Sequence, residues 1–226
     1  WTLCVTGDFD RKAVEAFARS LPVPSASKVE TALPEWEEFG PFAVGCDPSE
    51  QAVYALGFHA PGMDSPDRPA MEMLLRCLNG GGGLLYRALR HERQLCYSAE
   101  ALDWCEGRAG FVGICVQTSP ENMEEAADAL EAVIERLCEE GPTAEELERG
   151  RSEAASFIRR RMQDIGGRAF ETARQVLRGR GMDFERRWAE GLRSVTAEDI
   201  REVAQRYLVL EEAAELCIMP EDAMEE

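Results

Sequence analysis

Apolar residues recur along the chain with two different periods, and each period predicts one kind of element. Alternation of apolar and polar residues predicts β-strands at about 3–7, 42–46, 51–59, 97–105, 109–118 and 213–219. Apolar residues three and four positions apart predict helices at about 10–20, 67–78, 84–93, 120–140, 143–163, 168–178, 184–192 and 196–207. Hairpins combined with helices that are grouped in the sequence predict an α+β fold, a mostly antiparallel sheet backed by helices on one face.

Polar residues at the edges of these segments predict where helices begin. Asp10 and Ser119 each stand where a helix N-cap is expected, and Thr143 with Glu146 has the spacing of a capping box. The Pro- and Ser-rich segment 21–34 is expected to be a poorly packed linker. The strand at 109–118 has small or apolar residues on both faces, which predicts a central position in the sheet.

Length and charge narrow the possible functions. A chain of 226 residues can bury one substantial core, and we expect a single domain over residues 1–226. The formal net charge of −18 disfavours a nucleic acid partner, and no apolar run reaches the roughly 20 residues that span a bilayer. The chain begins WTLCVTGDFD without an initiator Met or a signal sequence, so we expect it to be part of a longer protein.

The cysteines do not have the spacing of a disulfide or zinc scaffold. All eight occur without any C-x-x-C pair, and Cys77, Cys115 and Cys138 fall at apolar positions of predicted elements. Most of them are therefore interpreted as small buried hydrophobic residues, which favours a reducing, cytoplasmic compartment.

Four consecutive glycines, Gly80, Gly81, Gly82 and Gly83, follow the predicted helix at 67–78. A phosphate-binding loop would follow a strand and would end in Lys followed by Ser or Thr, whereas this run continues as Leu-Leu-Tyr. The local pattern indicates a flexible turn between two helices.

Metal and nucleophile patterns are missing from the chain. The two histidines, His59 and His91, belong to neither H-E-x-x-H nor H-x-x-E-H, so no metal ligands are predicted. Ser98 lacks a nucleophile elbow, and Cys96 is better explained as a small apolar residue than as an activated thiol. The acidic pair that contains Glu146 is expected on a solvated helix start.

Arg90 and Tyr97 flank one predicted corner between a helix and a strand. Composition alone favours a structural interpretation, in which the arginine extends to solvent and the tyrosine packs.

Six stretches, read in order, change that interpretation. They are CVTGDFD, VYALGFHAP, LNGGGGLLYRALRHERQLCYSAEA, AGFVGICVQTSPENMEEAADAL, GPTAEELERGRSEA and SVTAEDIREVAQRYL. Together they resemble the C-terminal, non-zinc domain of the insulinase/pitrilysin-type metallopeptidases, which include mitochondrial processing peptidase. The resemblance covers nearly the whole chain.

The resemblance implies a metallohydrolase-like α+β domain that forms the C-terminal half of a longer two-domain peptidase. It implies zinc bound by an H-x-x-E-H motif in another domain, and no cofactor in this chain. An L-R-x-x-x-x-L-x-Y pattern, here with Arg90 and Tyr97, implies side chains that reach the bound peptide. Tyr97 is expected to contact the oxyanion formed at the zinc and Arg90 to position the substrate, while Gly80 to Gly83 are expected to touch substrate through their backbone.

These implications leave two functions open. The first is the noncatalytic C-terminal domain of a zinc endopeptidase that acts on peptides or unfolded proteins. The second is a zinc-less partner subunit, in a homo- or heterodimer, or an assembly protein without proteolytic activity. The chain departs from the family where Gly83-Leu84-Leu85-Tyr86 replaces Ser-Arg-Leu-Phe and where Cys96 replaces a small Ala or Gly.

Overall fold

A computed structural model describes residues 2–22, 42–47, 50–107 and 109–221, and these divide between two compact units. The larger unit comprises Phe39–Ala155 and Trp188–Glu226, and the smaller unit comprises Trp1–Glu38 and Ser156–Arg187. Most of the expected linker at 21–34 lies outside the described residues.

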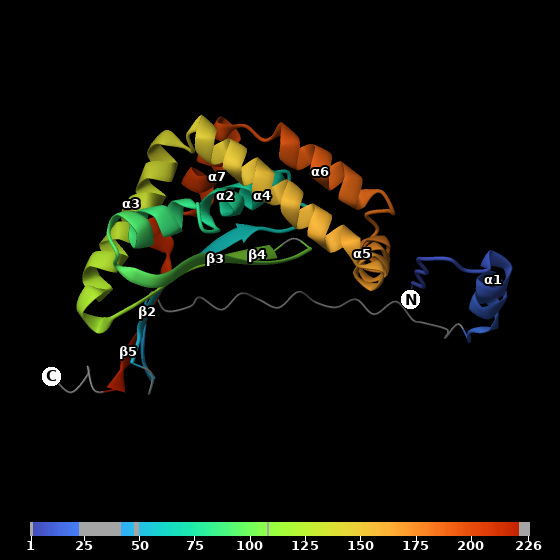
Figure 1. Cartoon of the computed structure of the whole chain (residues 1–226), viewed down its shortest axis with the longest axis horizontal. Helices are drawn as coiled ribbons and strands as arrows, with labels where there is room; N and C mark the ends of the chain where they lie inside the picture. Colours follow the sequence, from blue (N-terminus) through green and yellow to red (C-terminus); the bar gives the residue numbers. More distant parts are fainter. Residues whose placement is uncertain (1, 23–41, 48–49, 108, 222–226) are drawn as a thin grey trace. The chain divides into compact units, whose positions relative to one another are not determined.

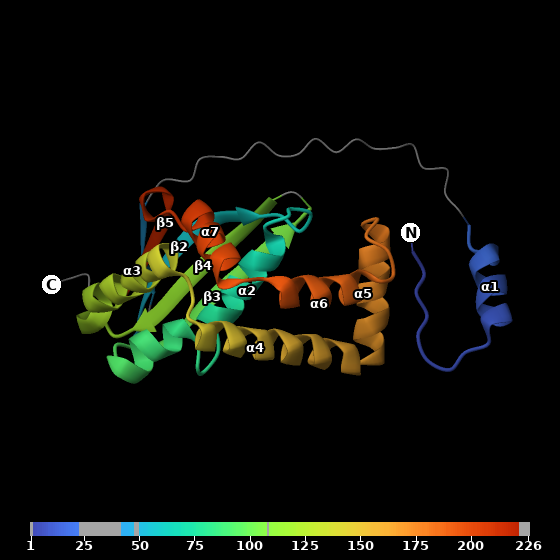
Figure 2. The same cartoon turned by 90° about the horizontal axis from the view of Figure 1, so that it is seen from above.

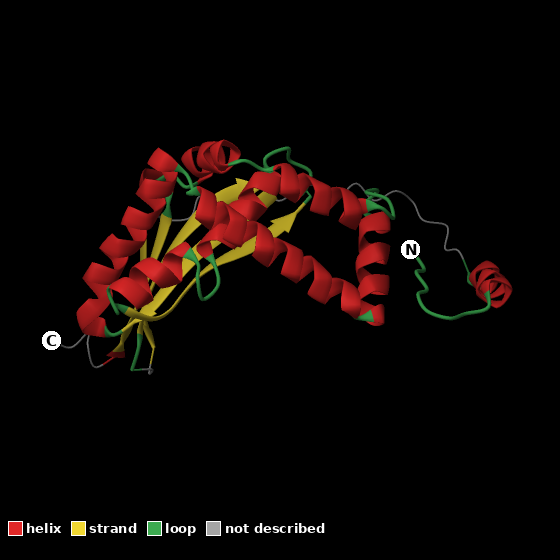
Figure 3. Cartoon of the chain, turned by 45° about the horizontal axis from the view of Figure 1, so that its top comes forward, coloured by secondary structure: helices red, strands yellow, loops and turns green. Residues whose placement is uncertain are grey.

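One five-stranded sheet forms the frame of the larger unit, shown in yellow in Figure 3. Its strands are β1 (Phe42–Asp47), β2 (Ala52–Pro61), β3 (Cys96–Glu106), β4 (Ala109–Thr118) and β5 (Ala214–Pro220). Their spatial order is β1-β5-β2-β4-β3, and only the β1–β5 pair is parallel. The predicted central position of 109–118 is confirmed, because β4 lies between β2 and β3.

The described part of the chain forms seven α-helices and a π-helix, η1, of which α1 and α5 belong to the smaller unit. They are α1 (Arg11–Ser20), α2 (Arg68–Leu78), η1 (Tyr86–Glu92), α3 (Met123–Glu140), α4 (Ala144–Gln163), α5 (Ile165–Leu177), α6 (Phe184–Ser194) and α7 (Ala197–Tyr207). Short 3-10 turns, η2 (Pro120–Asn122) and η3 (Leu210–Glu212), precede α3 and β5. No helix among the described residues is both long enough and apolar enough to cross a membrane.

Helices α2, α3 and α7 lie on one face of the sheet (Figures 1 and 2). Leu56 of β2, Ile114 of β4 and Leu130 of α3 are buried almost completely between the two layers. This arrangement confirms the predicted α+β fold with a mostly antiparallel sheet backed by helices on one face.

Large apolar side chains are exposed on β3 and β4. Leu102 is 50% exposed, Trp104 59% and Phe111 46%, and register pairs Trp104 with Phe111. The Phe111 ring lies against Gly57 and Gly113, where an added Cβ would come within 3.0 Å and 3.1 Å of it. Because these alternate residues point away from the buried face, the other face of the sheet has an apolar surface.

Helix capping agrees with the predictions at two of three positions. Asp10 accepts hydrogen bonds from the backbone N–H groups of α1, and Thr143 and Glu146 form the expected reciprocal pair at α4. Thr196 forms a second capping box at α7. The side chain of Ser119 does not cap a helix, because the chain first makes the 3-10 turn Pro120–Asn122.

One predicted element is wrong in kind. Residues 3–7 form no strand, and Thr6 instead donates a hydrogen bond from its hydroxyl to the carbonyl of Ile165. Alternation alone does not make a strand, which also needs a partner for its backbone groups. The helix expected at 84–93 is present, and most of it is the π-helix η1, whose wider turns the apolar spacing does not distinguish from those of an α-helix.

Candidate functional site

The glycine run begins the candidate site, and two of its members have distinct structural reasons to be glycine. Gly80 has φ +87°, a backbone conformation that favours glycine. An added Cβ on Gly83 would lie 2.3 Å from the carbonyl oxygens of Leu78 and Asn79, so only glycine permits this close approach. Gly80, Gly81 and Gly82 are exposed. The turn interpretation is therefore supported by geometry.

The π-helix η1 follows the turn and presents Arg90 to solvent. Leu85 and Leu89 are fully buried and anchor the segment against the core, whereas Arg90 is exposed. A π-helix is rare and occurs frequently at functional sites, because the inserted residue rotates the side chains that follow it.

The connection from η1 to β3 contains a strained residue. Gln94 has φ +57°, and among the residues that the structure describes no other non-glycine residue has a positive φ. The Leu95 amide donates to the Leu89 carbonyl (2.8 Å), and the buried Thr118 hydroxyl donates to the Leu95 carbonyl (2.5 Å). These bonds hold the corner in a conformation that ordinary residues adopt at a cost of about 1–3 kcal/mol.

Tyr97 sits at an irregularity in the β3–β4 ladder. Cys96 pairs with Thr118 and Ser98 with the adjacent Gln117, so Tyr97 has no partner of its own in the register. Its side chain is 54% exposed. An extra residue of this kind redirects a side chain, and such bulges are enriched next to active sites.

The structure brings Arg90 to the peptide bond that precedes Tyr97. A guanidinium nitrogen of Arg90 donates a 2.8 Å hydrogen bond to the carbonyl oxygen of Cys96. Two groups that the sequence separates by seven positions therefore share one corner.

The chemistry of this corner is that of hydrogen-bond donors. Burial raises the pKa of the Cys96 thiol, an effect that the nearby Arg90 only partly opposes, so the thiol is not an activated nucleophile. Among the described residues, no three His, Cys, Asp or Glu side chains are placed to hold a metal ion. His59 lies in β2 and His91 in η1, and neither belongs to a ligand set that would fit zinc.

The family model named "Peptidase M16 inactive domain" matches residues 1–153. The chain belongs to the M16 peptidase family as an inactive domain. That assignment confirms the resemblance drawn from the sequence and places the chain among the noncatalytic domains of metallopeptidases.

Solved structures share the fold of this M16 inactive domain. An M16 inactive domain from Pseudomonas fluorescens is 21% identical, with a TM-score of 0.78, and the match covers 95% of this chain and 52% of that one. A protease from Helicobacter pylori is 17% identical, with a TM-score of 0.81, covering 95% and 53%. The inactive peptidase domain of a proposed zinc protease from Bordetella parapertussis is 22% identical, with a TM-score of 0.65, covering 74% and 91%.

The M16 inactive domain spans about half the length of the first two of these proteins. No protein with curated annotation matches the chain.

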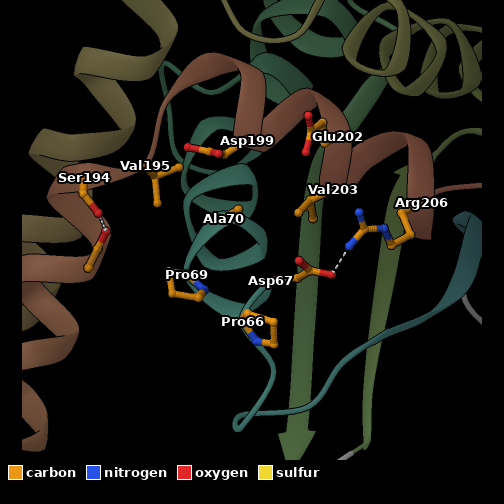
Figure 4. A pocket seen from close by; sticks show the side chains of 11 residues that line it. Pro66, Asp67, Pro69, Ala70, Ser194, Val195, Asp199, Glu202, Val203 and Arg206 are labelled. Carbon is orange, nitrogen blue, oxygen red and sulfur yellow. Dashed lines mark hydrogen bonds and ion pairs between the residues drawn. The ribbon is translucent and has the colours of Figure 1, made fainter.

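A hollow away from this corner of the M16 inactive domain is lined by α2, α6 and α7 and has a volume of about 240 Å³ (Figure 4). Asp67 points across it to Arg206, with which it forms an ion pair, and also accepts a 2.9 Å hydrogen bond from the Tyr207 hydroxyl. Asp199, on its rim, belongs to the capping box of α7. Asp67 therefore joins the start of α2 to the end of α7, whereas Asp199 caps the first turn of α7, so both carboxylates have a structural role.

Sequence reasoning missed two buried charged residues of the M16 inactive domain. Glu146, expected on a solvated face, is only 3% exposed and pairs with Arg87 and Arg136. Arg68 is 1% exposed and pairs with Asp103 of β3. The capping box gave a partial signal for Glu146, since its side chain had to turn back toward Thr143, but nothing in the local sequence signals the burial of Arg68.

Proposed function

We propose that residues 1–226 form the C-terminal, noncatalytic half of a two-domain zinc endopeptidase. In this proposal Arg90 and Tyr97 act on peptide bound at a zinc site in another domain. The observation that carries the proposal is the convergence of a π-helix, a left-handed Gln94 and an irregular ladder on the corner that displays these two side chains. Strained geometry of this kind persists where function requires it.

The exposed hydroxyl of Tyr97 supplies a donor that cleavage of a peptide bond needs. Attack on a peptide carbonyl develops negative charge on its oxygen, and a donor aimed at that oxygen stabilises the transition state more than the substrate. A zinc ion bound in the other domain would supply the activated water for this attack.

Arg90 is proposed to orient the substrate backbone. Its guanidinium has five N–H donors in a fixed planar arrangement, and one of them bonds the Cys96 carbonyl at 2.8 Å. Further donors are available to a peptide carbonyl by charge-assisted hydrogen bonds.

Gly80, Gly81, Gly82 and Gly83 are proposed to contact the peptide through their backbone. No atom lies within 4 Å of a Cβ placed on Gly80 or Gly81, so the turn leaves room for a chain to approach. The first three of these glycines are exposed.

The zinc-bearing domain is proposed to be the partner that covers the apolar face of the sheet. This face exposes Leu102, Trp104 and Phe111, and solvated surfaces rarely expose such a group of large apolar side chains. The chain matches about half of each of two related structures. A second half of similar size is therefore proposed as the partner.

A zinc-less subunit that pairs with a separate zinc-bearing chain, or a noncatalytic assembly protein, is the second candidate. The same apolar face fits this candidate too, because a partner in a separate chain would cover it equally well. An H-x-x-E-H motif elsewhere in the full-length protein distinguishes the two, since only the first candidate requires it.

Replacing Arg90 by Ala in the full-length protein is expected to raise KM for a peptide substrate about tenfold or more and to change kcat less. The reason is the loss of charge-assisted bonds to substrate, each contributing about 1.5–3 kcal/mol. Steady-state kinetics measures both constants. Arg93→Ala is the matched control, because Arg93 is an exposed arginine just after η1. An unchanged KM in Arg90→Ala, or an equal rise in Arg93→Ala, would contradict the substrate-binding role.

A further inference from the structure

Glu146 is a buried carboxylate that joins three elements. It lies in the first turn of α4, accepts a 2.9 Å hydrogen bond from the Thr143 amide, and forms ion pairs with Arg87 of η1 and with Arg136 of α3 (3.1 Å to the latter). Burial alone would raise the pKa of Glu146, but the Thr143 amide and the two guanidinium groups lower it overall. The carboxylate therefore stays ionised near neutral pH and holds both arginines.

One turn further along α4, Arg149 holds the C-terminal end of α2. Its guanidinium donates to the carbonyl oxygens of Cys77 and of Asn79, the latter at 3.2 Å. Carbonyl groups at the end of a helix lack an N–H donor from the helix itself, so Arg149 caps α2 by donating to them. The two helices meet closely, since a Cβ added to Gly150 would lie 2.9 Å from the Cys77 sulfur.

Asn79 ties the same point to the edge strand β3. Its side-chain amide donates to the Ala101 carbonyl (2.8 Å) and accepts from the Ala101 amide (2.7 Å). The amide thus bonds Ala101 as a neighbouring strand would, on the side of β3 where the described residues supply no further strand.

These contacts fix both ends of the segment that carries the candidate site. Arg149 and Asn79 hold its beginning, immediately before the glycine turn, and Glu146 holds η1 through Arg87, one turn before Arg90. Between these two anchored ends, a Cβ added to Gly80 or Gly81 would have no neighbouring atom within 4 Å. A glycine-rich segment has high conformational freedom, so its position depends on the groups that hold its ends.

We propose that the first two turns of α4 act as a clamp in which Glu146 and Arg149 are positioning residues for the glycine turn and for the corner with Arg90 and Tyr97. The clamp rests on the proposed function, because its purpose is to fix donors that contact the substrate. Neither Glu146 nor Arg149 touches the substrate in this proposal; each acts through the segment 79–92.

Glu146→Gln in the full-length protein tests the clamp. The amide retains the shape and can still accept from Thr143, but it loses the charge that holds Arg87. We expect amide hydrogen exchange to rise at least tenfold in the segment 83–95 and kcat/KM to fall about tenfold. Glu148→Gln is the matched control, since Glu148 lies on the same helix, is 69% exposed at its side chain and pairs with Arg151. This control is expected to change neither quantity.

The exchange measurement separates failure of the clamp from failure of the proposed function. Unchanged exchange in 83–95 of Glu146→Gln would overturn the clamp even if Tyr97 proves catalytic. Raised exchange in this segment alone would support the clamp even if the Tyr97 variant is fully active. If Glu146→Gln does not fold, Arg87→Gln breaks the same ion pair from its half-exposed side, and the same two exchange outcomes decide.

Discussion

Tyr97→Phe in the full-length protein is expected to lower kcat for peptide cleavage by about 10²–10³-fold while KM changes little. Removal of one donor to the oxyanion of an acyl-transfer intermediate typically has this effect, because the donor acts mainly in the transition state. The fold should tolerate the change, since the side chain is 54% exposed and lies at an irregular point of the ladder.

Tyr86→Phe provides a matched control for this experiment. Tyr86 begins η1 and is 38% exposed, so the same hydroxyl is removed from a tyrosine near the site. Steady-state kinetics at equal zinc content is the measurement. Full turnover in Tyr97→Phe, or an equal loss in Tyr86→Phe, would reduce Tyr97 to a surface residue.

Arg68→Met is expected to lower the free energy of unfolding by about 3–5 kcal/mol. Arg68 is 1% exposed and joins the start of α2 to Asp103 of β3 and to Glu72. Burial alone would lower the pKa of Arg68, but Asp103 more than offsets this and raises it, so the guanidinium stays charged. Removing Arg68 leaves the Asp103 carboxylate without its cation, whereas Glu72 keeps its ion pair with Arg76.

Urea unfolding of the chain measures this difference, with Arg206→Met as the control. Arg206 pairs with Asp67 but is 56% exposed, so its loss should cost less than about 1 kcal/mol. In a second step, Arg68→Met combined with Asp103→Leu should recover much of the loss, because no unpaired carboxylate remains at position 103. Equal stability of Arg68→Met and Arg206→Met would show that the buried pair does not hold α2 on the sheet.

The fold followed from the sequence where local signals and burial agree. The hairpin of β3 and β4, the apolar stripe of α3 and the capping box at Thr143 each depend on neighbours in the sequence, and each was predicted. The strand expected at 3–7 failed because strand formation depends on a distant partner, which alternation cannot reveal.

The candidate site was found through the family resemblance rather than through composition. Arg90 and Tyr97 are ordinary residues by type, and periodicity did not reveal the π-helix, the left-handed Gln94 or the irregular pairing at Tyr97. The burial of Glu146 and Arg68 was likewise hidden, because each is paired with a residue from a distant part of the chain. Such pairings arise from tertiary packing, which local patterns do not encode.

Zinc content and peptidase activity of the isolated chain test the central claim most directly. The claim is that this M16 inactive domain supplies donors to a zinc site that it does not itself contain. After incubation with zinc and removal of excess metal, we expect well under one zinc per chain and no peptide cleavage. Stoichiometric zinc together with proteolysis that a chelator abolishes would contradict the claim.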